Sequence, residues 1–244
     1  MLLDEPPPAQ GELRFSLLGI PVRVHPLFWF ISLVLGLGAT GGEVTAVLIW
    51  IGVVFVSVLV HEMGHALVAK YYGWPPSITL YGMGGIASYR PTYYSTSSRV
   101  NISLAGPLAG FLLAALLIVL VRASGHDLLF EWSREGLAID TDYARRIDEM
   151  LRYLLYVNIF WGLINLLPVL PLDGGHVARE LLFAAGGSAG LRQAMGLSVA
   201  AGAAVAVYAY VFLGSTYLAL MFAYLAYQNY AMLGGNVGSS GRWD

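Results

Sequence analysis

The stretch WIGVVFVSVLVHEMGHALVAKYYG, residues 50–73, is an apolar run that leads into two histidines and a glutamate. One glycine and one serine are the only breaks among the apolar side chains of residues 50–60, so a helix through this run places His61 and Glu62 far from water. Ionisable side chains at such depth in a membrane helix are costly and mark function. Because residues four apart share one face of a helix, His61 and His65 can reach one ion.

The spacing of these side chains predicts a metal-dependent hydrolase. In such enzymes two histidines one helical turn apart bind zinc, a third ligand comes from elsewhere in the chain, and a glutamate beside the first histidine handles a proton. We expect the helix to run from about residue 46 to Gly73, which places His61 about 18 Å before its end. The alternative is a set of polar residues at a helix end near the membrane interface.

The composition of the 244 residues is typical of a membrane protein. Apolar residues make up 57% and charged residues 11%, whereas soluble domains have about 45–50% and about 25%. The mean hydropathy is +0.67. A net charge of −2 provides no basic field for nucleic acid. Because the chain has no cysteine, any metal must be held by His, Asp or Glu.

The apolar runs predict an all-α polytopic membrane protein with about six transmembrane helices, since a span needs about 20 apolar residues. Residues 73–98 are rich in Gly, Pro and Tyr, and there we expect a short membrane-associated β-hairpin with strands 77–81 and 86–90. Residues 123–149 hold seven of the fifteen acidic residues and indicate a solvated loop. The six expected spans are residues 25–40, 44–72, 102–121, 150–170, 191–213 and 216–233.

The spans define one transmembrane domain at residues 25–233, with its core at about 45–185. We expect an N-terminal cytoplasmic tail at 1–24 and a flexible C-terminal tail at 234–244. Residues 1–14 carry three acidic side chains and no cationic start, which argues against a signal peptide. With the N-terminus in the cytoplasm, eight Lys and Arg residues fall inside and five outside, which favours this orientation in the cell (inner) membrane.

A second polar motif, NLLPVLPLDGG, covers residues 165–175. Its prolines break the preceding helix and free backbone groups, and irregular backbone at membrane depth is tolerated only when buried in protein or lining a wet cavity. Asp173 is therefore well placed as the third metal ligand, and Gly174 and Gly175 allow its backbone to approach the metal helix closely. The alternative is an Asp-Gly-Gly turn at the membrane surface.

Together the two motifs resemble those of the site-2 proteases, a family of polytopic intramembrane zinc metalloproteases. The family pairs His-Glu-x-x-His on one transmembrane helix with Asn-x-x-Pro-x-x-Pro-Leu-Asp-Gly on a later one, and both motifs are complete here. The resemblance extends to Gly84-Gly85 in the hairpin and Ala105-Gly106-Pro107 in the third span, and it is to a compact form without a PDZ or nucleotide-sensing domain. It implies that one Zn²⁺ per chain is bound by His61, His65 and Asp173, that Glu62 is the general base and that Asn165 holds the substrate or the developing oxyanion.

The resemblance also implies that the substrate is the transmembrane segment of another membrane protein, cleaved within or near the lipid bilayer. A helix hides its carbonyls in hydrogen bonds, so such a segment must unwind, and its backbone groups then need partners. We expect one edge of the hairpin, at Gly84, Gly85 and Ile86, to pair with the substrate as an added strand. Either Thr79 or Ile86 would lie on the pairing edge. The alternative is a re-entrant loop that only plugs the cavity.

Two other classes of protein remain as alternatives. A membrane metal transporter would carry ligands on several spans and would lack a glutamate beside the first histidine. A catalytically inactive relative that acts as a scaffold would have lost a ligand or Glu62. A serine protease is disfavoured, because the sequence GSSG at 238–241 lies in the expected tail and has no membrane-embedded histidine as a partner.

Overall fold

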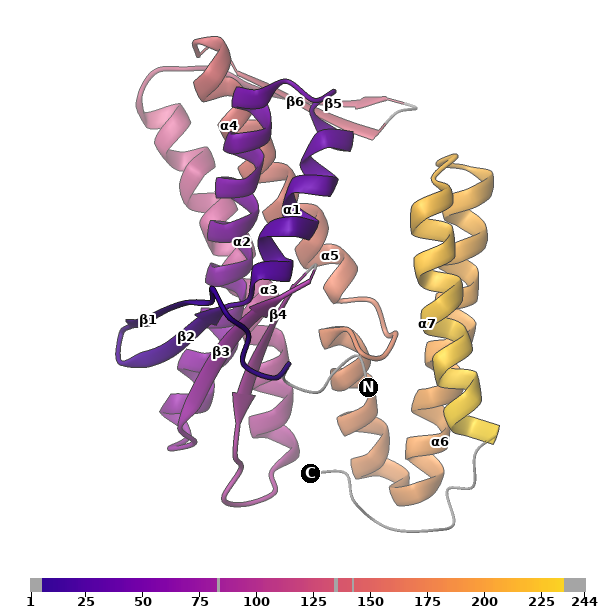
Figure 1. Ribbon diagram of the computed structural model, residues 1–244. Helices are drawn as coiled ribbons and strands as arrows, with labels where there is room; N and C mark the ends of the chain where they lie inside the picture. Colours follow the sequence, from indigo (N-terminus) through magenta and orange to yellow (C-terminus); the bar gives the residue numbers. More distant parts are fainter. Residues whose placement is uncertain (1–5, 83, 134–135, 142, 235–244) are drawn as a thin grey trace. The chain divides into compact units, whose positions relative to one another are not determined.

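The computed structural model describes residues 6–82, 84–133, 136–141 and 143–234 (Figure 1). The chain forms two compact units, an N-terminal unit of residues 1–164 and a C-terminal unit of residues 165–244. The described residues are mainly helical and also form two small sheets. The expected all-α fold is therefore corrected to a mainly helical fold with β-structure beyond the expected hairpin. The expected C-terminal tail, apart from its first residue, lies outside the described residues.

Three helices make up most of the N-terminal unit: α1 (Pro26–Ala39), α2 (Val44–Tyr71) and α3 (Thr96–Ala123). α2 carries the histidine motif, and its bounds confirm the expected helix to within two residues. The carboxylate of Glu43 caps its start by accepting hydrogen bonds from first-turn amides. After α2 the backbone turns at Gly73, where φ is +79°, a conformation that glycine adopts readily.

A further helical segment, which begins in this unit, changes its winding midway. α4 (Arg145–Tyr156) continues into the π-helical stretch η1 (Val157–Trp161), which leads to α5 (Gly162–Asn165). After α5, residues 166–172 are not helical. The expected span at 150–170 is therefore interrupted twice, because the π-turn alters the hydrogen-bonding pattern and the prolines cannot continue the helix.

A four-stranded sheet lies beside these helices, with the strand order β1-β2-β3-β4. The expected hairpin is confirmed as β3 (Pro76–Tyr81) and β4 (Gly84–Tyr89), which pair antiparallel. β1 (Leu13–Leu17) and β2 (Ile20–Val24) form a second antiparallel pair, and β2 runs parallel to β3. The segment expected to be a tail thus contributes half of the sheet.

Side-chain alternation explains why residues 20–24 form a strand. Ile20, Val22 and Val24 are buried, while the residues between them face away. They pack with Ile78 and Leu80 of β3, and the same core includes Val58, Met63 and Ala66 of α2. This core fixes the sheet against the helix that carries the histidines.

Two more strands lie in the segment that the sequence indicates as a solvated loop. β5 (Leu128–Ser133) and β6 (Gly136–Thr141) pair antiparallel in a two-stranded sheet. The acidic residues hid this hairpin from sequence analysis, because such residues are depleted in strands on average but do not by themselves prevent strand pairing.

The C-terminal unit is a pair of packed helices, α6 (Asp173–Val211) and α7 (Thr216–Gly234). α6 contains one non-helical residue, Gly187, with φ +57° and ψ −131°, where the helix changes direction. The expected span at 191–213 is the second arm of α6, and the first arm runs from Asp173 to this kink.

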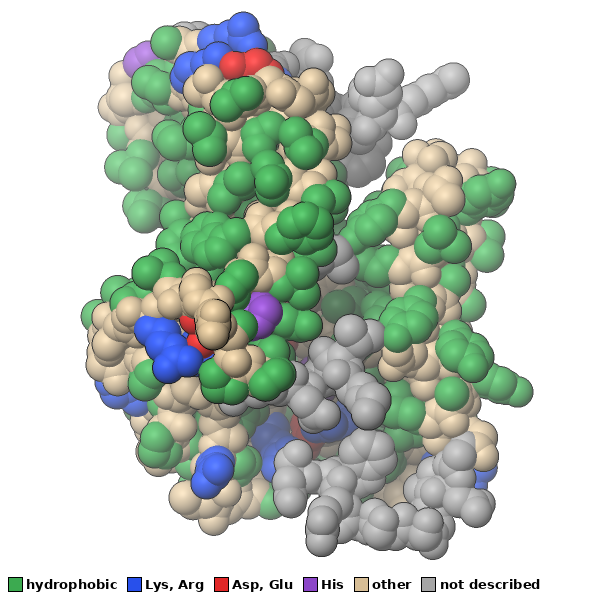
Figure 2. Space-filling model, in the orientation of Figure 1, with side chains coloured by type: hydrophobic (Ala, Val, Ile, Leu, Met, Phe, Trp, Pro, Cys, Tyr) green, Lys and Arg blue, Asp and Glu red, His purple; other side chains and the backbone are tan. Residues whose placement is uncertain are grey.

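Among the described residues, three helices are long and apolar enough to cross a membrane: α2, α3 and α6. On α3, a stripe of side chains four residues apart is more than half exposed: Leu108, Leu112, Leu116 and Leu120. Figure 2 shows hydrophobic side chains over the middle of the N-terminal unit and charged side chains toward its two ends. These features define a membrane protein. Six spans are not confirmed, because α1 has only 14 residues, about 21 Å of helix against a core of about 30 Å.

Candidate metal centre

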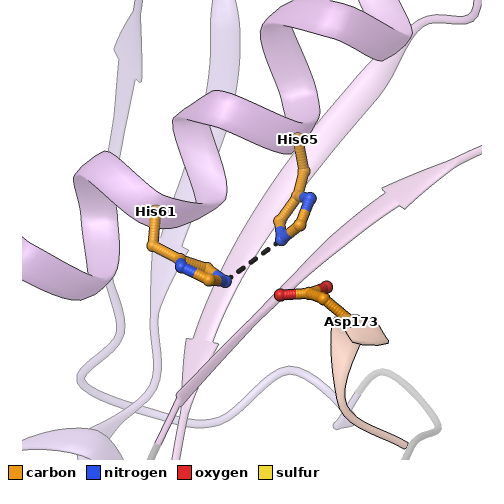
Figure 3. A group of neighbouring side chains, drawn as sticks. All are labelled: His61, His65 and Asp173. Carbon is orange, nitrogen blue, oxygen red and sulfur yellow. Dashed lines mark hydrogen bonds between the residues drawn. The ribbon is translucent and has the colours of Figure 1, made fainter. Parts of the chain in front are cut away.

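His61 and His65 lie one turn apart on α2, and both are buried. Their Nε2 atoms are 3.1 Å apart, and the ring planes are inclined by 79° (Figure 3). Two nitrogen ligands of a tetrahedral zinc ion, each about 2.0–2.1 Å from the metal, lie about 3.3 Å apart. The imidazole pair therefore fits a single zinc ion.

The orientation of His65 is set by a contact with α3. Its Nδ1 lies 2.6 Å from the carbonyl oxygen of Ile102. Because a carbonyl can only accept a hydrogen bond, Nδ1 carries the proton and Nε2 presents a lone pair. Metal-binding histidines are commonly held in this way by a backbone carbonyl, which fixes both the tautomer and the ring orientation.

Gly106 of α3 leaves room for the two imidazoles. A Cβ atom at this position would lie 2.8 Å from Nε2 of His61 and closer still to Nε2 of His65. On the facing helix, a Cβ at Gly64 would lie 2.8 Å from Cβ of Ala109. Glycine at these positions therefore brings α2 and α3 together and leaves the histidine nitrogens accessible to an ion. The sequence motif Ala-Gly-Pro included Gly106 but did not reveal this contact.

The carboxylate of Glu62 lies against the hairpin. Glu62 is only 5% exposed, and a Cβ at Gly85 of β4 would lie 2.8 Å from its Oε1 atom. Gly84 lies on the same strand, where a Cβ would be 4.0 Å from the ring of Trp161. The structure thus brings the glutamate of the histidine motif and Gly85 of the hairpin together.

Asp173 and Asn165 belong to the C-terminal unit. Asp173 is the first residue of α6 (Figure 3) and is partly buried, and Asn165 ends α5 and is buried. Gly174 and Gly175 pack against the backbone of residues 166–170, where an added Cβ would be 2.6 Å or less from main-chain oxygens. These two glycines therefore let the motif fold closely against its own preceding loop, and their expected approach to the metal helix stays a prediction.

Asn158 of η1 is a buried polar residue that the sequence analysis did not single out. Its amide donates to Oγ of Ser57 at 2.9 Å and to the carbonyl of Leu154 at 2.8 Å. Ser57 precedes His61 by one helical turn on α2. A second Asn in the apolar run 150–170, besides Asn165, was the available signal, because polar side chains inside membrane segments need partners. This bond ties η1 to the metal helix.

Charged residues anchor the other end of α2, outside the apolar segment. The guanidinium of Arg146 binds both carboxylate oxygens of Glu43, at 2.6 and 3.0 Å, and also contacts Glu149 at 2.9 Å. The hydrogen bond from Arg146 is the main cause that lowers the pKa of Glu43 from 4.5 to about 2. Since Glu43 also caps α2, this network joins the start of the metal helix to α4.

Comparison with known proteins assigns the family. Residues 49–209 match the sequence profile of peptidase family M50, and the chain belongs to that family. It is 29% identical over 175 residues to a zinc metalloprotease of Methanocaldococcus jannaschii, covering 69% of this chain and 44% of that protein. It is 27% identical to stage IV sporulation protein FB of Bacillus subtilis, over 65% of this chain and 46% of that protein.

The match to a solved structure concerns the fold. The site-2 protease from Methanocaldococcus jannaschii superposes with a TM-score of 0.57 at 22% sequence identity, over 96% of this chain and 100% of that one. The chain spans less than half the length of the curated relatives that it matches.

Proposed function

We propose that this protein is an intramembrane zinc metalloprotease that hydrolyses peptide bonds within or near transmembrane segments of membrane-protein substrates. The observation that carries the proposal is the pair of buried imidazoles on α2, with Nε2 atoms 3.1 Å apart and a buried carboxylate on the same helical turn. Membership of peptidase family M50 supports the reaction class.

We assign His61, His65 and Asp173 as the ligands of one zinc ion. Each offers one ligand atom, an imidazole nitrogen or a carboxylate oxygen. Two histidines and one carboxylate make up a donor set of catalytic zinc sites, which keep a fourth position for water. Bound there, zinc lowers the pKa of its water toward about 7 and polarises the peptide carbonyl.

Glu62 acts as the general base in this proposal. It accepts a proton as water attacks the peptide carbonyl and passes it to the leaving nitrogen. Its burial against Gly85 keeps the carboxylate beside the metal-binding turn. Asn165 is proposed to donate a hydrogen bond to the substrate carbonyl, where negative charge develops.

Zinc content is the direct test of the metal assignment. Elemental analysis of the purified protein should give one zinc per chain, none in a His61→Ala/His65→Ala variant, and a reduced amount in Asp173→Asn. His126→Ala, at a histidine between α3 and β5, is the matched control and should keep full zinc. Stoichiometric zinc in the double variant would contradict the assignment.

The free edge of β4 is proposed to bind the unwound substrate. Among the described residues, β4 pairs only with β3. The carbonyl of Leu80 accepts a hydrogen bond from the amide of His25 at 2.9 Å, so the main-chain groups of Leu80 face β2. Leu80 and Gly85 are therefore a non-hydrogen-bonded pair, and the main-chain groups of Gly85 and of Ala87 face the free edge.

This geometry sharpens the residue assignment within the hairpin. Thr79 and Ile86, the next pair in the β3–β4 ladder, are therefore a hydrogen-bonded pair. Their main-chain groups face each other and not a substrate, so the expectation that one of them lies on the pairing edge is corrected. Gly85 lies on the free edge beside Glu62. A strand added at Gly85 and Ala87 would place its backbone next to the general base, which supports strand addition over a loop that only plugs the cavity.

Proline substitution tests the edge. Ala87→Pro removes an amide that faces the free edge, a position where a strand tolerates proline, so zinc should stay bound while cleavage of transmembrane substrates is lost. Ala87→Val keeps the amide and should cleave within a few-fold of the wild type. Full cleavage by Ala87→Pro would contradict strand addition.

We also propose a cell-membrane location with a cytoplasmic N-terminus and six spans. In this arrangement α1, residues 150–170 and α7 cross the bilayer in addition to α2, α3 and the second arm of α6. The distribution of Lys and Arg supports the orientation. A shorter α1 is compatible with spanning where the surrounding bilayer thins.

A further inference from the structure

The loop that precedes Asp173 makes few backbone hydrogen bonds of its own, because two of its residues are prolines, which have no amide hydrogen to donate. Within residues 168–172, the amide of Val169 binds the carbonyl of Leu167 at 2.7 Å, and the amide of Leu172 binds the carbonyl of Val169 at 2.8 Å. Leu170, between the two prolines, has neither of its backbone bonds inside the loop. In a membrane interior such groups must be paired.

Two buried side chains from α6 and α7 supply the partners of Leu170. The amide of Leu170 donates to Oγ of Ser198 on α6 at 3.1 Å. The carbonyl of Leu170 accepts from Nδ2 of Asn229 on α7 at 2.8 Å. Ser198 is 1% exposed and Asn229 is fully buried. All three residues belong to the C-terminal unit.

The bonding pattern of Ser198 and Asn229 is directed at the loop. Each side chain makes one hydrogen bond to the carbonyl four residues earlier in its own helix, at Ala194 and Leu225, and its other bond goes to Leu170. Polar residues that only join two membrane helices would bond across the α6–α7 interface. These two instead hold both backbone groups of a single loop residue.

We propose that Ser198 and Asn229 are positioning residues for the zinc ligand Asp173, an inference that rests on the proposed function. Leu170 precedes Asp173 by three residues, one of them the rigid Pro171. Fixing both backbone groups of Leu170 therefore fixes where α6 starts and where its first carboxylate points. Asn229 lies outside residues 49–209, which match the family profile, so the inference gives α7, a helix beyond the matched residues, a part in positioning the metal ligand.

The test measures zinc itself in the purified full-length protein. Asn229→Leu and Ser198→Ala each remove one bond to Leu170, and each should weaken zinc binding in a chelator competition about 10- to 100-fold, the usual cost of losing an orienting partner. With Co²⁺ in place of zinc, the visible absorption bands, which report ligand geometry, should shift. Gln228→Leu, at the neighbouring and partly exposed position on α7, is the matched control and should match the wild type in both measurements.

The outcomes separate this inference from the assignment of Asp173. If Ser198→Ala and Asn229→Leu fold with wild-type zinc affinity and an unchanged Co²⁺ spectrum, the positioning role is wrong even where their thermal stability falls. If Asp173→Asn keeps wild-type affinity, the ligand assignment itself is wrong. Should Asn229→Leu fail to fold, Ser198→Ala alone decides, since it removes a single hydroxyl.

Discussion

At the scale of single residues, the metal centre depends on the missing side chain at Gly106 as much as on the two histidines. Gly106 has no side chain where a Cβ would lie 2.8 Å from Nε2 of His61. The carbonyl of Ile102, one turn earlier on the same helix, fixes the ring of His65. α3 therefore shapes the site through a backbone oxygen and a missing methyl group.

Gly106→Ala should for this reason abolish zinc binding. The added methyl group occupies the space of the imidazole nitrogens. Moving α3 away from α2 to make room would break the close packing of Gly64 against Ala109. Gly52→Ala is the matched control, because a Cβ at Gly52 meets nothing within 4 Å, and it should gain about 0.5–1 kcal/mol of stability. Metal content and thermal unfolding check both variants, and full zinc in Gly106→Ala would overturn this view of α3.

The sequence predicted which side chains of α2 lie close together, because their geometry is local. His61, Glu62 and His65 lie within one helical turn, so helical periodicity alone brings them together. Ser198 and Asn229 could not be predicted in the same way. Their partner, Leu170, is 28 and 59 residues away along the chain. The sequence of an apolar helix does not indicate which distant loop a polar side chain within it will contact.

At the scale of secondary-structure elements, α2 is fixed at both of its ends. The sheet core of β2 and β3 packs on it near the histidines, and the carboxylate of Glu43 joins its start to Arg146 of α4. β2 was missed in the sequence because its parallel partner, β3, lies more than 50 residues away. The β3–β4 hairpin was found because its two strands are adjacent and meet at glycines.

The ion pair at the start of α2 should make stability depend on acid. The pKa of Glu43 is about 2 in the folded protein against an ordinary 4.5. The ionised carboxylate therefore contributes fully to the free energy of unfolding above pH 4.5, and this contribution is lost as the pH falls toward 2. Arg146→Gln returns this pKa toward its ordinary value. The difference in thermal midpoint between the wild type and Arg146→Gln, followed by circular dichroism, should therefore shrink from pH 6 to pH 2.5.

Arg145→Gln serves as the control for this experiment. Arg145 pairs with Glu149 but not with Glu43 in the described structure, so the bidentate contact at the helix start survives. A difference in thermal midpoint that stays constant over the whole pH range for Arg146→Gln would show that the Glu43 pair does not control the stability of α2.

At the scale of the whole molecule, orientation in the membrane follows from the spans. In chain order α1, α2 and α3 lie between β2 and β5. If all three cross the bilayer, reporter fusions after Glu12 and after Asp140 should report opposite sides, with Glu12 in the cytoplasm. Fusions that report the same side would remove α1 from the set of spans, since α1 is the shortest of the three.

Cleavage by the purified enzyme in lipid vesicles tests the central claim most directly. The substrates are transmembrane peptides with and without helix-breaking Gly, Pro or Asn residues in the span. The wild type should cleave the helix-breaking peptides faster. Glu62→Gln should keep one zinc per chain and lose about 10²–10⁴ in rate, because the amide cannot accept a proton from the attacking water. Hydrolysis by Glu62→Gln at near wild-type speed would contradict the account of this protein as a zinc protease with Glu62 as its base.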